Sequence, residues 1–142
     1  MNDQQLSAVL HQRGQRVTPQ RLVIHRALRE LDDHATAEEV LDAVEDKLPN
    51  VSLPTVYSTL ELFEQLGVVR RLGVVQGAVL YDPRPDPHDH LVCERCGRIE
   101  DLDAGVELAG ALRRARRRGF QATRAEVRIS GICSDCVRDA SR

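Results

Sequence analysis

Every cysteine in this chain lies in its C-terminal part, in two Cys-x-x-Cys pairs, Cys93–Cys96 and Cys133–Cys136. Each pair offers two sulfurs to one metal ion, and two pairs complete the tetrahedral four-cysteine shell that is typical of structural zinc sites. A closed shell leaves no open position for a substrate, so we expect this zinc to stabilise the fold rather than to catalyse. The C-terminal part of the chain, about 55 residues, is too small to have enough hydrophobic core to fold alone, and zinc would supply the missing cross-link.

Two disulfides are the alternative use for four cysteines. The N-terminus, Met1 to Gln5, is polar and has neither the charged start nor the apolar core of a signal peptide. We therefore expect a soluble protein in the reducing cytoplasm, where zinc is favoured over disulfides. No apolar stretch approaches the roughly 20 residues that cross a bilayer, so no membrane partner is expected.

Three prolines at alternate positions, Pro83, Pro85 and Pro87, predict a stiff, extended segment that neither a helix nor a central strand accepts. We interpret this segment as a hinge between two domains. The predicted organisation is a first domain over residues 1–82, a hinge over 83–88 and a second domain over 89–142.

Three helices of the first domain are marked by a hydroxyl residue at the N-cap, followed by apolar residues at helical spacing. The second of them also carries a capping box, and the second and third, joined by a tight turn, predict a helix-turn-helix. The caps and their helices are Thr18 before residues 19–31, Thr36 before residues 37–47, and Ser52 before a helix that ends at Gly67.

After the third helix the apolar pattern changes to that of strands. Residues 68–72 and 78–81 flank a glycine-bounded loop over residues 73–77 and predict a β-hairpin. A helix-turn-helix followed by a hairpin is the winged-helix arrangement, whose second helix enters the major groove of double-stranded DNA.

The second domain shows short apolar runs at residues 91–93 and 127–129, which predict strands around a helix near residues 106–118. The predicted fold class is therefore α+β, with an N-terminal winged helix-turn-helix domain and a small C-terminal α/β dimerisation domain held by the four-cysteine zinc site. An antiparallel sheet in the second domain would continue across the twofold axis of a homodimer, and a palindromic operator would mirror that axis.

The net charge of −2 is unusual for a DNA-binding protein, but the distribution of charge matters more. Five arginines between residues 13 and 29 share a segment without an acidic residue, whereas residues 30–46 hold eight acids and no Lys or Arg. We interpret the basic segment as phosphate-facing, although a solvated helix face is the simpler interpretation for any single arginine, and Tyr57 fits a core position equally well. The candidate DNA contacts are Arg16, Arg21, Ser52, Thr55, Tyr57 and Ser58.

A second arginine run, over residues 113–118, also invites a nucleic-acid interpretation. Such runs are more often the solvated face and the positive C-terminal charge of a helix, which here would end at Gly119. We adopt this second interpretation.

Four stretches of the chain, in order and spacing, resemble the signature stretches of the ferric uptake regulator family. The likeness extends from about Leu6 to Cys136, and the agreement of several motifs makes it specific. Members of this family are homodimeric bacterial repressors with an N-terminal winged-helix domain and a C-terminal α/β dimerisation domain, which a bound metal closes into the shape that binds DNA. The four stretches are Arg16–Arg21, His34–Val40, Thr55–Leu60 and His88–Gly97.

The resemblance implies two metal sites. Three imidazoles and two carboxylates without a thiolate, the donors implied for the regulatory site, suit Fe²⁺ or Mn²⁺, but Zn²⁺ accepts the same donors, so the shell alone leaves the metal open. These donors come from both domains, so metal binding would tie the domains together and strengthen DNA binding. The implied ligands are Cys93, Cys96, Cys133 and Cys136 for structural zinc, and His34, Asp82, His88, His90 and Asp101 for the regulatory metal.

Within the family, Asp101 resembles the peroxide-sensing branch, because the iron-sensing branch tends to carry glutamate there. Pro87 and Ala125 stand where the iron-sensing branch often has further histidines, and no cysteine lies near residue 82, as the zinc-sensing branch would require. The resemblance thus implies a metal-dependent transcriptional repressor that responds to peroxide through Fe(II)-catalysed oxidation of His34 or His88. An iron- or manganese-responsive regulator of metal uptake is the alternative.

Two other classes of protein share the combination of histidine and Cys-x-x-Cys. A zinc hydrolase or nucleobase deaminase needs an open zinc position and the glutamate of a His-x-Glu motif, but this chain has His88-Asp89-His90, so we do not expect an enzyme. A structural zinc module that binds other proteins would not need His34, Asp82 and Asp101.

Overall fold

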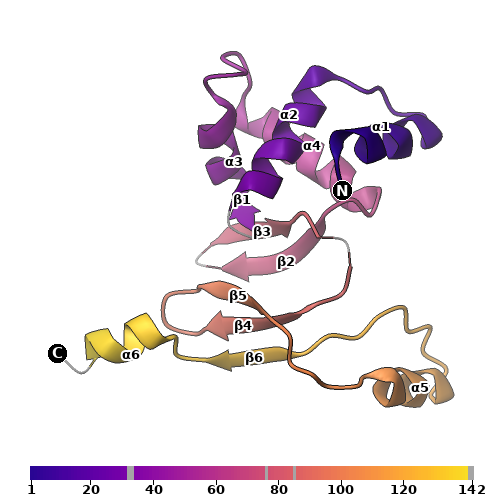
Figure 1. Ribbon diagram of the computed structural model, residues 1–142, viewed down its shortest axis with the longest axis vertical. Helices are drawn as coiled ribbons and strands as arrows, with labels where there is room; N and C mark the ends of the chain where they lie inside the picture. Colours follow the sequence, from indigo (N-terminus) through magenta and orange to yellow (C-terminus); the bar gives the residue numbers. More distant parts are fainter. Residues whose placement is uncertain (32–33, 76, 85, 141–142) are drawn as a thin grey trace. The chain divides into compact units, whose positions relative to one another are not determined.

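The computed structural model describes residues 1–31, 34–75, 77–84 and 86–140. The chain forms two compact units, Met1–Pro85 and Asp86–Arg142, and each contains helices and a three-stranded sheet (Figure 1). Pro85, the middle proline of the predicted hinge, lies outside the described residues, and the hinge stays a prediction. In the described part of the chain, no helix has both the length and the apolar character needed to span a bilayer.

Unit 1 contains four helices, and their N-caps explain where they begin. The predicted caps are confirmed: Thr18 Oγ1 accepts a hydrogen bond from Arg21 N at 3.2 Å, Thr36 Oγ1 from Glu39 N at 3.1 Å, and Ser52 Oγ from Thr55 N at 3.3 Å. The helix before them was not predicted, although Asn2 and Gln5 form a capping box at its start. The helices are α1 (Asp3–Gln12), α2 (Pro19–Glu30), α3 (Ala37–Val44) and α4 (Leu53–Gln65).

The α3 helix ends earlier than the predicted boundary at residue 47. Pro49 disfavours a helical backbone at Leu48, and the chain closes in a turn in which Leu48 N donates to Val44 O at 2.7 Å. At the end of α4, Gly67 adopts φ 73°, a left-handed conformation that favours glycine.

The sheet of unit 1 contains β1 (Ala35–Thr36), β2 (Arg70–Val75) and β3 (Ala78–Asp82), in the order β1-β3-β2 with antiparallel neighbours. The predicted loop over residues 73–77 was too long, because residues 73–75 belong to β2. Gly73, at φ 119°, lies at a shift in the β2–β3 register, so the strand continues through a bulge instead of ending there. Gln76, which belongs to the predicted loop, lies outside the described residues.

The four helices and the sheet share one core. Its fully buried side chains come from every helix and from β3, as the amphipathic pattern predicts. The helix-turn-helix of α3 and α4, followed by the β2–β3 hairpin, confirms the winged-helix prediction. Among the residues with no exposed surface are Leu6, Leu10, Ile24, Leu28, Val40, Val56, Leu60, Phe63 and Tyr81.

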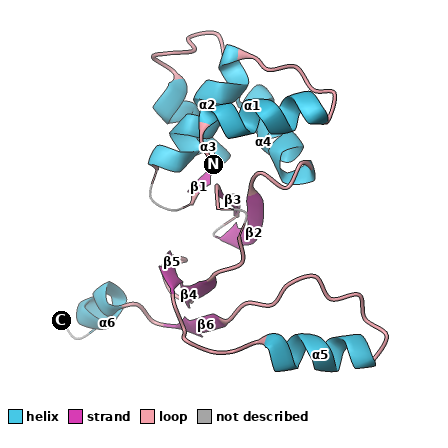
Figure 2. Ribbon diagram, turned by 45° about the vertical axis from the view of Figure 1, so that its right-hand side comes forward, coloured by secondary structure: helices cyan, strands magenta, loops and turns pink. Residues whose placement is uncertain are grey.

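Unit 2 is built on β4 (Asp89–Cys93), β5 (Ile99–Leu102) and β6 (Arg128–Gly131), in the order β5-β4-β6. We expected an antiparallel sheet, and this was only half right: β4 pairs antiparallel with β5 but parallel with β6. A parallel neighbour needs a long crossover, and here the crossover contains α5 (Ala109–Arg117). The last helix, α6 (Ser134–Ala140), was not predicted. Figure 2 shows the mixture of helices and strands that confirms the α+β class.

A histidine lies in the core of unit 1. His25, on α2, has no exposed surface and meets the ring of Phe63 edge-on, with 5.7 Å between the ring centroids. Neither ring nitrogen has a hydrogen-bond partner among the described residues. Burial, together with the nearby Arg29 guanidinium, lowers the pKa of His25 to about 4.

We predict that unit 1 loses stability in mild acid because of His25. The unfolded chain takes up a proton near pH 6.5, whereas the folded chain does so only near pH 4, so stability is complete above about pH 6.5 and falls as the pH drops through that window. At pH 5 the loss is about 2 kcal/mol. Urea unfolding at pH 7 and pH 5, followed by circular dichroism, measures it.

The matched variants are His25→Leu, which keeps the volume without the titrating group, and His11→Leu, which removes an exposed histidine from α1. The difference in stability between the two pH values should shrink in His25→Leu and persist in His11→Leu. An equal difference in wild type and His25→Leu would show that His25 does not set the acid response.

Candidate metal centres

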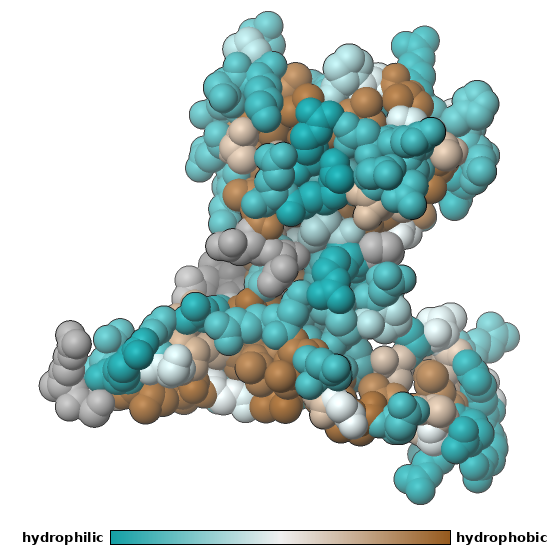
Figure 3. Space-filling model, in the orientation of Figure 1, coloured by the Kyte–Doolittle hydropathy of each residue, from teal (hydrophilic) through white to brown (hydrophobic). Residues whose placement is uncertain are grey.

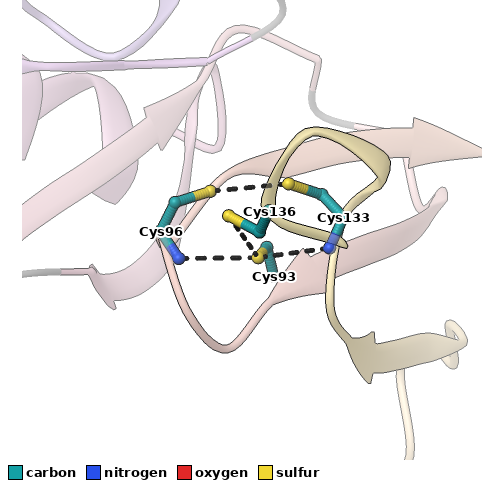
Figure 4. Close-up of side chains that lie close together, drawn as sticks. All are labelled: Cys93, Cys96, Cys133 and Cys136. Atoms are coloured by element: carbon teal, nitrogen blue, oxygen red, sulfur yellow. Dashed lines mark hydrogen bonds between the residues drawn. The ribbon is translucent and has the colours of Figure 1, made fainter. Parts of the chain in front are cut away.

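The first candidate centre is formed by the four cysteines at one end of the sheet of unit 2. Cys93 is the last residue of β4, and Cys96 follows in the turn toward β5. Because β4 and β6 run parallel, with Cys93 opposite Gly131, the chain leaving β6 carries Cys133 and Cys136 to the same end. Figure 4 shows the four sulfurs facing one another.

The distances between the sulfurs fit a tetrahedral ion. All four lie within 4.8 Å of one another, with 3.9 Å between the Sγ atoms of Cys93 and Cys136 and 3.8 Å between those of Cys96 and Cys133. A tetrahedron with zinc–sulfur bonds of about 2.3 Å has edges of about 3.8 Å, whereas a disulfide would bring two sulfurs to about 2.05 Å. The donor set therefore fits Zn²⁺.

The local backbone prepares one of these sulfurs to ionise. Cys93 Sγ accepts hydrogen bonds from Cys133 N at 3.3 Å and from Cys96 N at 3.5 Å, and these lower the pKa of Cys93 to about 6. The hydrogen bond with the Cys133 side chain raises the pKa of Cys136 to about 12. A metal ion would therefore release protons as it binds, since only thiolates are good ligands.

The second candidate centre lies toward the opposite end of β4. His88 and His90 are two residues apart, so their side chains leave the chain on the same face. The β4–β5 register pairs His90 with Asp101, and side chains paired in this way share a face of the sheet. Strand pairing thus places His90 beside Asp101, and the two-residue spacing brings His88, which directly precedes β4, to the same side.

The three side chains converge. Asp101 Oδ1 lies 3.3 Å from His88 Nε2 and 3.6 Å from His90 Nε2, and the two imidazole centroids are 4.4 Å apart. Each histidine side chain is only 7% exposed and Asp101 17%. Two histidines and one carboxylate that leave further positions open are a donor set for non-haem Fe²⁺, and Mn²⁺ accepts the same ligands.

Neighbouring groups fix the positions of these imidazoles. His88 Nδ1 lies 2.8 Å from the backbone carbonyl of Asp86, and donation of its proton to that oxygen leaves Nε2 as the ligand atom. Asp89, which sequence reasoning missed as a positioning residue, accepts hydrogen bonds from Val127 N at 2.7 Å and Ala104 N at 3.1 Å. These bonds lower the pKa of Asp89 and tie β4 to the segments on both sides of it. The alternation His-Asp-His was the available signal, since Asp89 must leave β4 on the face opposite the histidines.

The other two predicted ligands, His34 and Asp82, belong to unit 1. His34 directly precedes β1, and Asp82 is the fully buried last residue of β3. Ala35 pairs with Tyr81 in this antiparallel ladder, so one further residue along the register sets His34 opposite Asp82. Asp82 Oδ1 also accepts a hydrogen bond from Arg84 N at 2.7 Å. Their part in a common centre with the residues of unit 2 stays a prediction.

The predicted DNA contacts all lie in unit 1, and several already have partners. Ser52 and Thr55 form the cap of α4, and the Tyr57 hydroxyl donates to Glu38 Oε1 at 3.0 Å, which raises the pKa of Tyr57. Arg21 Nη1 donates to Arg16 O at 2.6 Å, while the Arg16 side chain and Ser58 are exposed. These six residues stay predicted contacts.

The basic segment is smaller than its sequence suggests. Arg26 and Arg29 both form ion pairs with Asp3 at the start of α1, the second at 2.7 Å, and the Arg26 guanidinium lowers the pKa of Asp3. Because these pairs use two of the five arginines, Arg13, Arg16 and Arg21 are the better candidates for phosphate.

A model described as "Ferric uptake regulator family" matches residues 12–130. The chain is 33% identical over 139 residues to a protein named "Peroxide-responsive repressor PerR" from Staphylococcus epidermidis, and the match covers 94% of this chain and 89% of that protein.

Solved structures show the same relationship. The ferric uptake regulator from Pseudomonas aeruginosa with manganese matches with a TM-score of 0.75 and 27% identity, over 90% of this chain and 97% of that one. A zinc uptake regulator complexed with zinc and DNA matches with a TM-score of 0.65 and 25% identity, over 99% of this chain and 95% of that one.

We predict that Cys96→Ser abolishes stoichiometric zinc binding and loosens unit 2. A structural zinc site contributes on the order of 10 kcal/mol to a small unit, more than its short sheet can replace. Elemental analysis measures bound zinc, and hydrogen exchange measures protection of the amides in residues 86–140. Ser134→Ala, beside Cys133 but without a thiol, is the control and should keep both. Full zinc content and unchanged protection in Cys96→Ser would contradict the four-cysteine site.

We also predict that Asp89→Ala weakens Mn²⁺ binding by about tenfold or more, as is usual when a group that orients metal ligands is lost. Its loss frees two backbone N–H groups and the strand that carries His90. Asp103→Ala is the control, because in the described part of the chain this carboxylate accepts a hydrogen bond only from the nearby Gly105 N, and its loss should leave the affinity close to that of wild type. Calorimetric titration gives both values, and equal affinities in the two variants would rule out the positioning role.

Proposed function

Because this chain belongs to the ferric uptake regulator family, we propose that it is a metal-dependent repressor that binds a double-stranded DNA operator as a homodimer. Members of the family are transcriptional regulators rather than enzymes. The observation that carries the proposal is the convergence of His88 and His90 on Asp101, at the other end of β4 from a separate four-cysteine cluster. One site suits a structural ion and the other an exchangeable one, which is what a metal-responsive regulator requires.

In this proposal the regulatory ion is Fe²⁺ or Mn²⁺, held by His34 and Asp82 of unit 1 and by His88, His90 and Asp101 of unit 2. The likeness to a regulator solved with manganese supports this choice of metal. The ligands of each unit are pre-positioned by a strand ladder, so the ion would join two rigid pieces. Zn²⁺ in the shell of Cys93, Cys96, Cys133 and Cys136 would stay in place throughout the response.

We further propose that the protein responds to peroxide. Asp101 supports this branch, as does the likeness to a peroxide-responsive repressor. Bound Fe²⁺ would supply the reduction of peroxide; in the net reaction one imidazole C–H becomes a carbonyl, the ring gains one oxygen atom, and hydrogen peroxide becomes water. Oxidation of His34 or His88 in this way removes a good ligand, so that metal and DNA are released.

The DNA-binding surface would be the N-terminal part of α4, together with the chain just before α2 and the first turn of α2. Ser52, Thr55, Tyr57 and Ser58 would face the major groove, and Arg16 and Arg21 the phosphates. The likeness to a zinc uptake regulator solved with DNA supports this surface. A homodimer presents two such surfaces, so the operator would be palindromic. Because a bacterial repressor acts on DNA in the cytoplasm, the protein would act there.

The alternative is a regulator of iron or manganese uptake that does not sense peroxide. The same five ligands would hold the ion, and histidine oxidation would play no part. This candidate differs from the first only in how the iron form responds to peroxide.

The test begins with DNA selected from a random pool by the Mn²⁺-loaded protein. We predict that removal of the regulatory metal weakens binding to this DNA by about 10- to 100-fold, the usual range of coupling between two sites. Brief anaerobic exposure to peroxide should abolish binding by the Fe²⁺ form but not by the Mn²⁺ form. Intact mass and peptide mapping should place one added oxygen on His34 or His88.

His88→Ala should lose the metal dependence, whereas His11→Ala, which removes an exposed histidine from α1, should behave like wild type. Retention of DNA and mass by both metal forms after peroxide would favour the uptake regulator. Equal affinity for the selected DNA with and without the regulatory metal would overturn both candidates.

A further inference from the structure

The arginine run on α5 forms a positive surface that the proposed repressor does not use. None of the residues of α5 is buried, and Figures 1 and 2 show the helix standing clear of the sheet formed by β4, β5 and β6. Between Leu108 and Ala125 the chain holds six arginines and no acidic residue. Figure 3 shows strongly hydrophilic residues at the end of unit 2 that carries this helix.

The helical period divides α5 into two faces. Arg113, Arg114 and Arg117 share one face, opposite the face that carries Leu112 and Ala115. All three arginines are exposed. We call these three residues the α5 arginine face.

Within the described chain, the α5 arginine face has no carboxylate partner, whereas two other arginines of unit 2 form ion pairs. Arg98 contacts Glu100 at 3.1 Å and Asp135 at 2.7 Å, and Arg138 contacts Asp135 as well. The neighbouring Arg116 also has a partner, because its Nη2 donates to the backbone carbonyl of Ala122 at 3.2 Å.

The arginines destabilise the helix on which they lie. Arg113 and Arg117 are four residues apart and Arg114 and Arg117 three apart, so like charges face one another along the helix. The N-cap, Leu108, makes no side-chain hydrogen bond, and Gly110 lies in the first turn. Anions bound along this face would remove the repulsion and hold the helix.

In place of the solvated face that we expected from the sequence, we propose that the α5 arginine face binds the phosphate backbone of double-stranded DNA, independently of base sequence and of the regulatory metal. Guanidinium groups offer forked donors that bind phosphate oxygens in pairs, and adjacent phosphates neutralise several arginines at once. An anionic membrane is the other extended polyanion, but a helix that lies in a membrane surface inserts bulky apolar residues. The face of α5 away from the arginines carries one leucine and small alanines, which favours DNA.

The contact would give the protein a second hold on DNA, in a unit other than the winged helix. It would raise the local concentration of repressor along the duplex without selecting a site, because phosphate contacts carry no base information. This inference goes beyond the proposed function and does not depend on it.

The test compares the full-length protein with a variant that carries Arg113→Gln, Arg114→Gln and Arg117→Gln, since glutamine keeps the helix propensity of arginine. The probe is a short duplex of arbitrary sequence, titrated at several salt concentrations with and without Mn²⁺. The slope of log affinity against log salt should fall by about three in the variant, roughly one for each phosphate that is no longer bound. Hydrogen exchange over residues 109–118 should slow when the duplex is added to wild type.

The control carries Arg95→Gln, Arg124→Gln and Arg128→Gln, three exposed arginines of unit 2 outside α5, with the same change in net charge. It should keep the slope close to that of wild type. Equal slopes in the two triple variants, whether changed or not, would overturn the proposal, because net charge or a solvated face would then explain the result. Slower exchange in α5 with phosphatidylglycerol vesicles but not with the duplex would also overturn it in favour of a membrane. Failure of the proposed repressor function would be seen in a different measurement, as equal affinity for the operator with and without the regulatory metal.

Discussion

The register of β4 is the constraint on which both candidate metal centres depend. Its pairing with β5 sets His90 opposite Asp101, and its pairing with β6 sets Cys93 opposite Gly131, beside the second cysteine pair. A slip of one residue would turn every side chain of β4 to the other face and separate both sets of ligands. Zinc bound by the four cysteines would clamp β4 to β6 at one end of the sheet. That clamp would help to keep the register that sets His90 opposite Asp101 at the other end.

The same kind of strand pairing explains why a single metal ion would be enough for the proposed response. Two imidazoles and a carboxylate are positioned by β4 and β5, with Asp89 holding the flanking segments, while the ladder of β1 and β3 positions His34 and Asp82. In the proposed site one ion binds ligands of both sets, so it would act on the arrangement of the two units. If metal binding makes the free energy of DNA binding more favourable, DNA binding must make the free energy of metal binding more favourable by the same amount.

Local signals in the sequence were enough for much of the fold. Hydroxyl caps at Thr18, Thr36 and Ser52 set the starts of three helices, and the Cys-x-x-Cys spacing was sufficient to expect four sulfurs in one cluster. Features that depend on partners distant in sequence escaped. The strands β1 and β5 are too short to show a period, and parallel pairing of β4 with β6 is visible only once the crossover is folded. The ion pairs of Asp3 with Arg26 and Arg29 were missed for the same reason, and they neutralise part of a segment that looks uniformly basic in the sequence.

Control of DNA binding by one metal ion is tested most directly by a calorimetric titration of Mn²⁺ into the zinc-loaded protein, alone and in the presence of its selected DNA. We predict that DNA tightens Mn²⁺ binding by the same factor by which Mn²⁺ tightens DNA binding, and that His34→Ala removes this coupling while leaving weak binding at His88, His90 and Asp101. Equal Mn²⁺ affinity with and without DNA would contradict the claim that one ion, held by ligands of both units, controls the response.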